Sequence, residues 1–232
     1  MQSEVIPQTA TRVDRPEAGL AVITVDDGKV NAFTPALLVQ LDQLLGELAR
    51  EGLAVVIAGR PGRFSAGFDL AVLGAGRSQA SELVRAGVGV LLRVLTHPRP
   101  VVAACGGHAI GMGAFLLVAA DYRVGAEGNF RIGLPEVASG IAISSMVFEL
   151  CRPRLTATAL NRTLRGETVS PAGALADGYL DELADLPGLL DVAVERASAM
   201  AANPPAGFEA TKAALRGPVV ESVRARMEAD LA

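Results

Sequence analysis

Residues 100–121, PVVAACGGHAIGMGAFLLVAAD, join two apolar runs through two glycine breaks. The first run, 101–105, is β-branched and small and has the length of a buried strand. The second, 114–120, is apolar on every side and rich in helix formers, which predicts a buried helix. A strand, a glycine turn and a helix start point unpaired N–H groups at a cleft, where they can hold a negative charge. Alone, the stretch is more typical of an ordinary strand-to-helix crossover.

The same alternation extends along the chain. Residues 1–17 are predicted to be a loose arm. Strands are predicted at 19–26, 53–58, 101–105, 121–125 and 129–132, with extended chain at 178–183. Helices are predicted at 35–50, 78–96, 114–120, 143–151, 156–164, 171–176, 187–201, 206–215 and 218–231. This order indicates an α/β class with an all-helical part from about residue 187.

Composition narrows the function classes. Half of the 232 residues are hydrophobic and the net charge is −4, which allows a large core and some apolar surface between subunits. No basic stripe with interleaved aromatics is present, so nucleic-acid binding is not expected. Cys105 and Cys151 lack metal-ligand spacing and are predicted to be buried free thiols. The polar N-terminal stretch does not read as a signal peptide and no apolar run is long enough for a membrane span, so the reducing cytoplasm is the expected location.

Two glycine turns that each follow an apolar strand, FSAGFDL at 64–70 and GHAIGMGAF at 107–115, carry a family resemblance. With VNAF at 30–33, GLPEVASG at 133–140 and SPAGALADGYLDEL at 170–183, they resemble the crotonase superfamily, the enoyl-CoA hydratase/isomerase fold. Within it, the chain is similar to a short actinobacterial hydratase-like branch. The resemblance implies a crotonase-like (ClpP/crotonase) α/β spiral of β-β-α units over residues 1–186. It also implies that residues 187–232 are a helical oligomerisation segment.

The resemblance implies a catalytic site for acyl-CoA thioesters. Its two oxyanion donors would be the main-chain N–H groups of Phe68 and Met112. Preorganised donors of this kind lower a barrier by about 2.7–4 kcal/mol each. Glu136 matches the acid–base residue of the PE motif, and its apolar flanks predict a raised pKa. The alternative is that Glu136 only favours a helix dipole in a first turn. Family hydratases have a second glutamate, and that position holds Phe115 here.

The resemblance also implies the substrate contacts. The nucleotide and pantetheine path would be lined by Lys29, Val30, Asn31, Ala66 and Phe68, with Lys212 as a weaker candidate. The acyl pocket would take Val72, Leu73, Phe115 and Ile141, each of which also fits plain core. Asp69 and His108 are further candidates, although Asp69 also fits a helix cap and His108 a structural histidine. His97 is predicted to lie at the surface, and Glu149 on a solvated face.

One carboxylate and an oxyanion hole suffice to move a double bond, so isomerisation of 3-enoyl-CoA is the expected reaction. The alternatives are a 2-enoyl-CoA hydratase and a catalytically silent acyl-CoA binding protein. A serine hydrolase is not expected because GxSxG is absent, and GMG lacks the GxGxxG spacing of a dinucleotide site. Coenzyme A would be part of the substrate, so no separate cofactor or metal is expected. The resemblance implies a homotrimer or a dimer of trimers.

Overall fold

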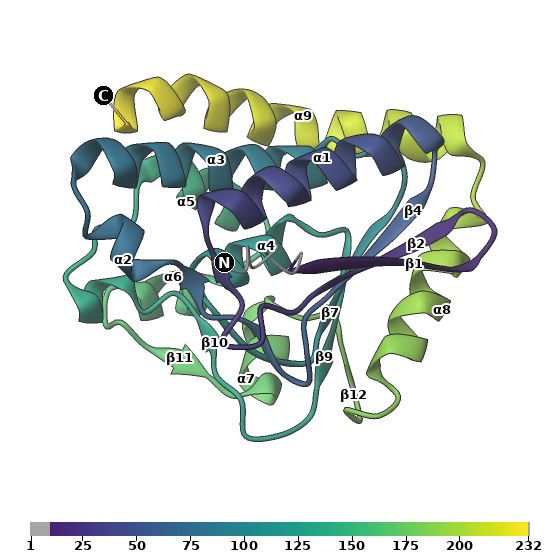
Figure 1. The fold of residues 1–232 in the computed structure, drawn as a ribbon, viewed down its shortest axis with the longest axis horizontal. Coiled ribbons are helices and arrows are strands. Elements are labelled where there is room, and N and C mark those ends of the chain that lie inside the picture. The colour runs from purple at the N-terminus through teal and green to yellow at the C-terminus, as the bar shows by residue number, and fades with distance from the viewer. Residues whose placement is uncertain (1–9, 232) are drawn as a thin grey trace, which may run out of the picture.

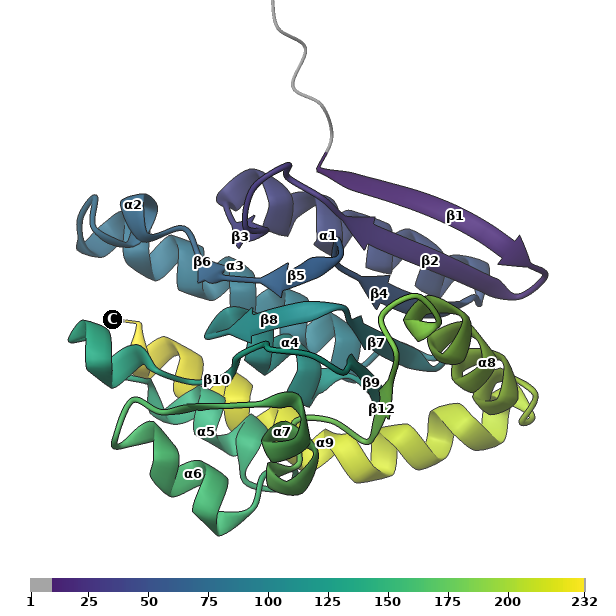
Figure 2. The same cartoon turned by 90° about the horizontal axis from the view of Figure 1, so that it is seen from below.

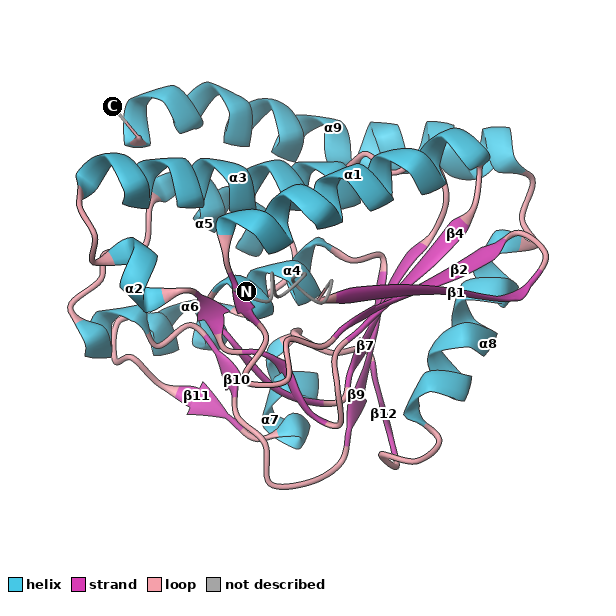
Figure 3. Cartoon of the chain, viewed as in Figure 1, coloured by secondary structure: helices cyan, strands magenta, loops and turns pink. Residues whose placement is uncertain are grey.

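A six-stranded, mostly parallel sheet forms the centre of the fold (Figures 1 and 3). The computed structural model describes residues 10–231. Its strands lie in the order β1 (Thr11–Glu17), β2 (Leu20–Val25), β4 (Ala54–Ala58), β7 (Val101–Cys105), β9 (Tyr122–Ala126) and β12 (Glu182–Ala184). Neighbours are parallel except for β1 and β2. Every residue of β4 and of β7 is buried, as expected for strands with helices on both faces.

Three of these strands lead directly into a second sheet. Its order is β11 (Thr168–Val169), β10 (Ile132–Gly133), β8 (Gly107–Ile110) and β5 (Gly62–Ser65). A two-stranded ribbon pairs β3 (Ala32–Phe33) with β6 (Gly67–Phe68). Since β5 follows β4, β8 follows β7 and β10 follows β9, each turn of the chain is a β-β-α unit. The predicted crotonase-like spiral is confirmed.

Helices cover both faces of the central sheet. The helices of the described chain are α1 (Pro35–Glu51), α2 (Leu70–Leu73), α3 (Arg77–Leu95), α4 (Met112–Ala119), the 3-10 turn η1 (Glu136–Ser139), α5 (Ser145–Cys151), α6 (Ala157–Thr163), α7 (Pro171–Asp177), α8 (Leu189–Ala201) and α9 (Pro205–Asp230). One face packs on α8, and the other packs on the larger core that contains α1, α3 and α4. Figure 2 shows α8 and α9 on different sides of the strands, and α9 packs on α5 and α3. Residue 187, where the helical segment is expected to begin, lies between β12 and α8.

Local signals explain where α1 begins and ends. Thr34 accepts a hydrogen bond from the Leu37 amide at 3.2 Å, and Pro35 occupies the first turn. Gly52 closes the helix with a left-handed φ of 71°, which glycine adopts at low cost. Between these caps the leucine side chains at 37, 38, 41, 45 and 48 are buried.

Four expectations about the chain are wrong. Thr11–Glu17 is the edge strand β1 and not a loose arm, while residues 1–9 lie outside the described part. Gly107–Ile110 is strand β8 and not a turn. The two final helices are one helix, α9, which continues through Pro218 because its side chains at 212, 216, 220 and 223 keep one buried face. His97 is buried with 1% exposure.

Cys105 and Cys151 are buried free thiols, as predicted. Within residues 10–231 we find no helix with the length and apolar character that crossing a membrane requires.

Candidate active site

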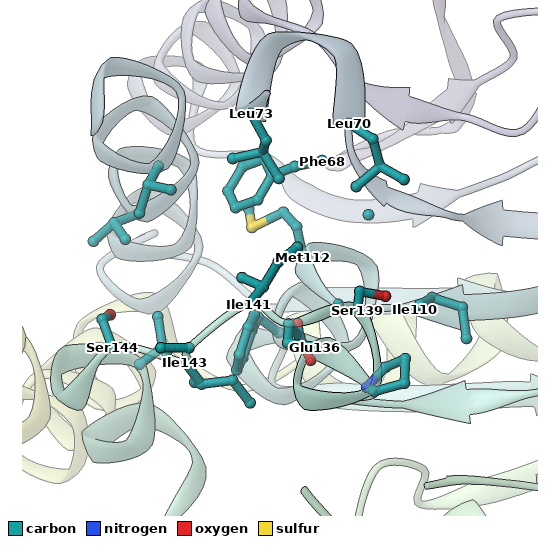
Figure 4. Close-up of a pocket in the computed structure, with 18 of the residues that line it drawn as sticks. Phe68, Leu70, Leu73, Ile110, Met112, Glu136, Ser139, Ile141, Ile143 and Ser144 are labelled. Atoms are coloured by element: carbon teal, nitrogen blue, oxygen red, sulfur yellow. The ribbon is translucent and has the colours of Figure 1, made fainter. Parts of the chain in front are cut away.

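A cavity of about 330 Å³ lies between the two glycine turns, α3 and α5 (Figure 4). Its walls include the predicted residues Ala66, Phe68, Leu73, Met112, Phe115, Glu136 and Ile141. These come from three stretches of the sequence, 66–73, 112–115 and 136–141, which the spiral brings to one place. Except for a few polar groups the lining is apolar, which is typical of small-molecule sites.

The first glycine turn is fixed by a buried polar network. The side chain of Asn31 is fully buried and donates hydrogen bonds to the carbonyls of Val25, Arg63 and Phe64. The Ser65 hydroxyl donates to the Asn31 carbonyl at 2.7 Å and accepts from the Gly67 amide at 3.0 Å.

The network continues on both sides of Phe68. The Ala66 amide donates to Val30 and the Asp69 amide donates to Phe33. The main chain that carries the Phe68 N–H is therefore held on each side.

The second glycine turn places the start of α4 beside the first. Gly111 has a φ of 54° and its amide donates to the Gly133 carbonyl at 3.0 Å. Met112 is the first residue of α4, where amides have no acceptor within the helix. A methyl group added at Gly67 would lie 3.5 Å from the Met112 nitrogen and 2.9 Å from the Ile110 oxygen. The segments that carry the two predicted donors are therefore packed directly together.

Glu136 brings a carboxylate to the same point. A methyl group added at Gly111 would lie 3.0 Å from its Oε1. Oε2 is buried and has no hydrogen-bond partner in the described chain. Burial raises the pKa of Glu136 to about 6, the direction that its apolar flanks predict. A carboxylate in such a setting can accept and return a proton near neutral pH.

A second carboxylate, Asp230, also lines the cavity, at the end of α9. Its Oδ2 accepts hydrogen bonds from the Met146 amide at 2.9 Å and the Ser145 hydroxyl at 3.0 Å. Asp230 thus caps the start of α5. Phe115, at the position where family hydratases have their other glutamate, is 5% exposed.

An open cleft of about 510 Å³ adjoins the cavity and shares Ala66, Ile110 and Pro135 with it. Val30 and His108 line this cleft with two arginines, Arg63 and Arg131. The pKa of His108 is lowered, first by burial and then by the charges of these arginines. The His108 Nδ1 accepts a hydrogen bond from the Arg131 amide at 3.1 Å, so this histidine also has a structural role. The cleft offers two cations to an anionic ligand.

Several predicted contacts have other roles in the structure. Asn31 is 0% exposed, so its side chain supports the turn and does not touch a ligand. The Asp69 carboxylate caps α2 by accepting from the amides of Ala71 and Val72. Lys29 is exposed and lines neither the cavity nor the cleft. Lys212 is buried and pairs with Asp121 at 2.6 Å, so its ammonium is engaged within the fold.

Sequence reasoning missed Ser65, Arg63, Arg131 and Asp230. Ser65 precedes the AG of the first turn and could have been suspected as a turn-stabilising hydroxyl. The two arginines and Asp230 carried no such signal, because their partners lie far away in the sequence.

Comparison with known proteins shows the family of this chain. The sequence model of the family described as enoyl-CoA hydratase/isomerase matches residues 15–232. A probable enoyl-CoA hydratase of Mycobacterium tuberculosis is 30% identical over 203 residues, which cover 86% of this chain and 77% of that protein.

Two solved structures are also similar. An enoyl-CoA hydratase/isomerase family protein from Pseudomonas syringae has a TM-score of 0.92 at 34% identity, covering 96% of each chain. The human mitochondrial delta3-delta2-enoyl-CoA isomerase has a TM-score of 0.90 at 25% identity, covering 96% of this chain and 89% of that one.

Proposed function

The chain belongs to the enoyl-CoA hydratase/isomerase family, and from this premise we propose that it isomerises 3-enoyl-CoA to 2-enoyl-CoA thioesters. The observation that carries the proposal is Glu136. Two carboxylates line the cavity in residues 10–231, Glu136 and Asp230. Glu136 has a buried oxygen without a hydrogen-bond partner, whereas Asp230 accepts hydrogen bonds from the start of α5.

In the proposed reaction the thioester oxygen lies between the amides of Phe68 and Met112. Glu136 removes a proton from C2, and the electron pair moves onto the thioester oxygen as an enolate. The protonated Glu136 then delivers the proton to C4, so that the double bond moves from C3=C4 to C2=C3. No atom is gained or lost. The two main-chain donors lower the barrier because they face the charge as it develops.

The coenzyme A portion is proposed to enter along the cleft beside the cavity. Ala66, Ile110 and Pro135 border both spaces, which supports a continuous route for a pantetheine arm. Arg63 and Arg131 are proposed to meet the phosphates, since guanidinium groups suit phosphate oxygens.

Hydration of 2-enoyl-CoA is the second candidate, favoured by the probable hydratase among the relatives. Hydration in this family normally uses two acidic groups, and Phe115 supplies none. A catalytically silent acyl-CoA binding protein is the third. The experiment is an assay of both enoyl-CoA positions in heavy water, with wild type and Glu136→Gln.

Isomerisation predicts loss of 3-enoyl-CoA and gain of 2-enoyl-CoA, both abolished by Glu136→Gln. Deuterium enters the product to the extent that the proton on Glu136 exchanges with solvent before it is returned to C4. Formation of 3-hydroxyacyl-CoA as the main product would favour hydration. Tight binding of acyl-CoA without turnover or exchange at C2 would favour the silent protein.

We also propose a trimer-based homo-oligomer that acts in the cytoplasm. Exposed apolar side chains such as Val137 and Leu164, at 46% and 72% exposure, support subunit contact. The two free thiols support a reducing compartment. Light scattering on the purified protein and cell fractionation test these two points.

A further inference from the structure

The side chains of Phe68 and Met112 rest on one glycine of α3. A methyl group added at Gly87 would lie 2.5 Å from Cζ and 2.6 Å from Cε1 of Phe68, and 3.4 Å from the Met112 sulfur. Figure 4 shows the Phe68 ring and the Met112 sulfur next to each other in the cavity wall. The side chains of the two predicted donor residues therefore occupy space that exists because residue 87 has no side chain.

A side chain at position 87 would have to move the ring. A non-bonded distance below 3.0 Å between a methyl carbon and a ring carbon requires one of the two to move. α3 is anchored by the buried Leu83, Val88 and Leu91. Both Phe68 and Met112 border the cavity, so the space available to a displaced ring is the cavity itself. The residue at position 87 thus sets how wide the cavity is beside the two donors.

The cavity that a displaced ring would enter is largely apolar. Beyond Phe68 and Met112 the cavity is walled by Leu73 of α2, by Val84, Val88 and Leu91 of α3, and by Val147 of α5. Its volume of about 330 Å³ is roughly twice that of an engineered cavity of about 150 Å³ that holds benzene. The cavity as a whole therefore has room for a hydrocarbon chain longer than a butenoyl group.

We propose that Gly87 is a specificity-determining residue that admits medium-length acyl chains, by letting the Phe68 ring and the Met112 thioether lie back against α3. The inference rests on the proposed function, because it takes the occupant of the cavity to be the acyl group of a coenzyme A thioester. Gly87 touches no reacting atom and acts through the two side chains that cover it.

The chain offers a matched control two residues away. Gly89 lies on the same helix, and a methyl group added there has no heavy atom within 4 Å. Alanine improves helix propensity at either position. Gly87→Ala and Gly89→Ala therefore differ in the displacement of Phe68 and Met112, and not in the type of substitution.

The test measures binding of saturated butyryl-, hexanoyl-, octanoyl- and decanoyl-CoA by calorimetry, and turnover of the 3-enoyl-CoA esters of the same lengths. Gly87→Ala should weaken decanoyl-CoA binding by about tenfold or more, as expected for a pocket that loses room for methylene groups, and leave butyryl-CoA within about twofold. Gly89→Ala should match wild type at every length. Met112→Ala keeps the main-chain amide and shortens the side chain, so it should shift the binding preference toward longer acyl chains. This variant replaces Gly87→Ala in the test if Gly87→Ala does not fold.

An equal loss at every length would overturn the inference, because it would mean that Gly87 only holds the Phe68 amide in place. An unchanged profile in Gly87→Ala, or in Met112→Ala where that variant is used, would also overturn it. If wild type binds none of the acyl-CoA esters, the proposed function fails together with this inference, and the wild-type titration alone reveals that case.

Discussion

The Ser65 hydroxyl joins the main chain of Asn31 to the first glycine turn, donating to the Asn31 carbonyl at 2.7 Å and accepting from the Gly67 amide at 3.0 Å. It also packs against α4, because a methyl group added at Gly113 would lie 2.8 Å from the Ser65 Cβ. One buried hydroxyl thus ties together the segments that hold Phe68 and Met112.

Ser65→Ala should therefore lower kcat with little change in KM. The two donors would remain but lose their fixed spacing, and a misplacement of about 1 Å costs about 100-fold in rate. We expect a fall in kcat of about 10- to 100-fold in steady-state assays. Ser170→Ala is the matched control, since Ser170 caps α7 by accepting from the Gly173 amide. An equal fall in kcat in both variants would contradict the positioning role of Ser65.

The pH dependence of turnover should follow Glu136. Its carboxyl must be ionised to remove a proton, and burial raises its pKa to about 6. kcat/KM should fall about tenfold for each pH unit below about 6. The pH profile of kcat/KM measures this in the free enzyme. A plateau that continues down to pH of about 4 would assign the base to another group.

The free energy of unfolding should change with pH in the direction opposite to kcat/KM, because of the same carboxyl. A folded-state pKa of about 6, raised from 4.5, means that the unfolded chain releases this proton first as pH rises. Stability from this group is therefore present below pH of about 4.5 and lost as pH rises through about 6. Glu136→Gln should be more stable than wild type at pH 7 by up to about 2 kcal/mol. The difference should vanish at low pH, which urea unfolding at several pH values measures.

Lys212 is expected to stabilise the fold and not to bind coenzyme A. Its ammonium pairs with Asp121 at 2.6 Å, with side-chain exposures of 6% and 8%. Lys212→Met should cost about 3–5 kcal/mol by leaving a buried carboxylate unpaired. Asp121→Asn in the same chain should recover part of that loss. Acyl-CoA affinity of the folded Lys212→Met protein should equal wild type, and weaker affinity without loss of stability would restore the expected ligand role.

Arg131 should contribute to recognition of the nucleotide and not to chemistry. Arg131→Ala should raise KM for the coenzyme A ester about tenfold, the loss of one charge-assisted contact of about 1.5 kcal/mol. The corresponding pantetheine thioester, which lacks the nucleotide phosphates, should be unaffected. Arg12→Ala, on exposed β1, is the control. A rise in KM for both substrates would contradict the proposed path.

Periodic segments of the fold were predictable from the sequence. The spacing of the leucines in α1 and the apolar run of β7 predict their burial from local sequence alone. Glu136 follows a proline in a motif that identifies it as a candidate acid–base residue. The family resemblance identifies Phe68 and Met112 as candidate oxyanion donors from their positions in the two glycine motifs. These features depend on residues that are close together in the chain.

Other features depend on distant partners and could not be predicted. Gly107–Ile110 reads as a turn but becomes β8 because it pairs with both β5 and β10. His97 ends a helix before a proline, yet it is buried, and its pKa is lowered to about 4 first by burial and with a contribution from Lys212 of α9. The close approach of Gly87 and Phe68 joins α3 to the first glycine turn. No pattern in either segment of the sequence predicts this contact.

The buried oxygen of Glu136 without a hydrogen-bond partner makes the proposed reaction and the stability of the fold favour different protonation states of this carboxyl. The charged form that the proposed reaction needs is the form that burial in the folded chain disfavours. Selection for heat resistance alone would therefore favour losing the carboxylate, and relatives that keep the fold without the reaction could arise through that single exchange. A glutamate at this position is thus a cost to the folded state that the proposed reaction would explain.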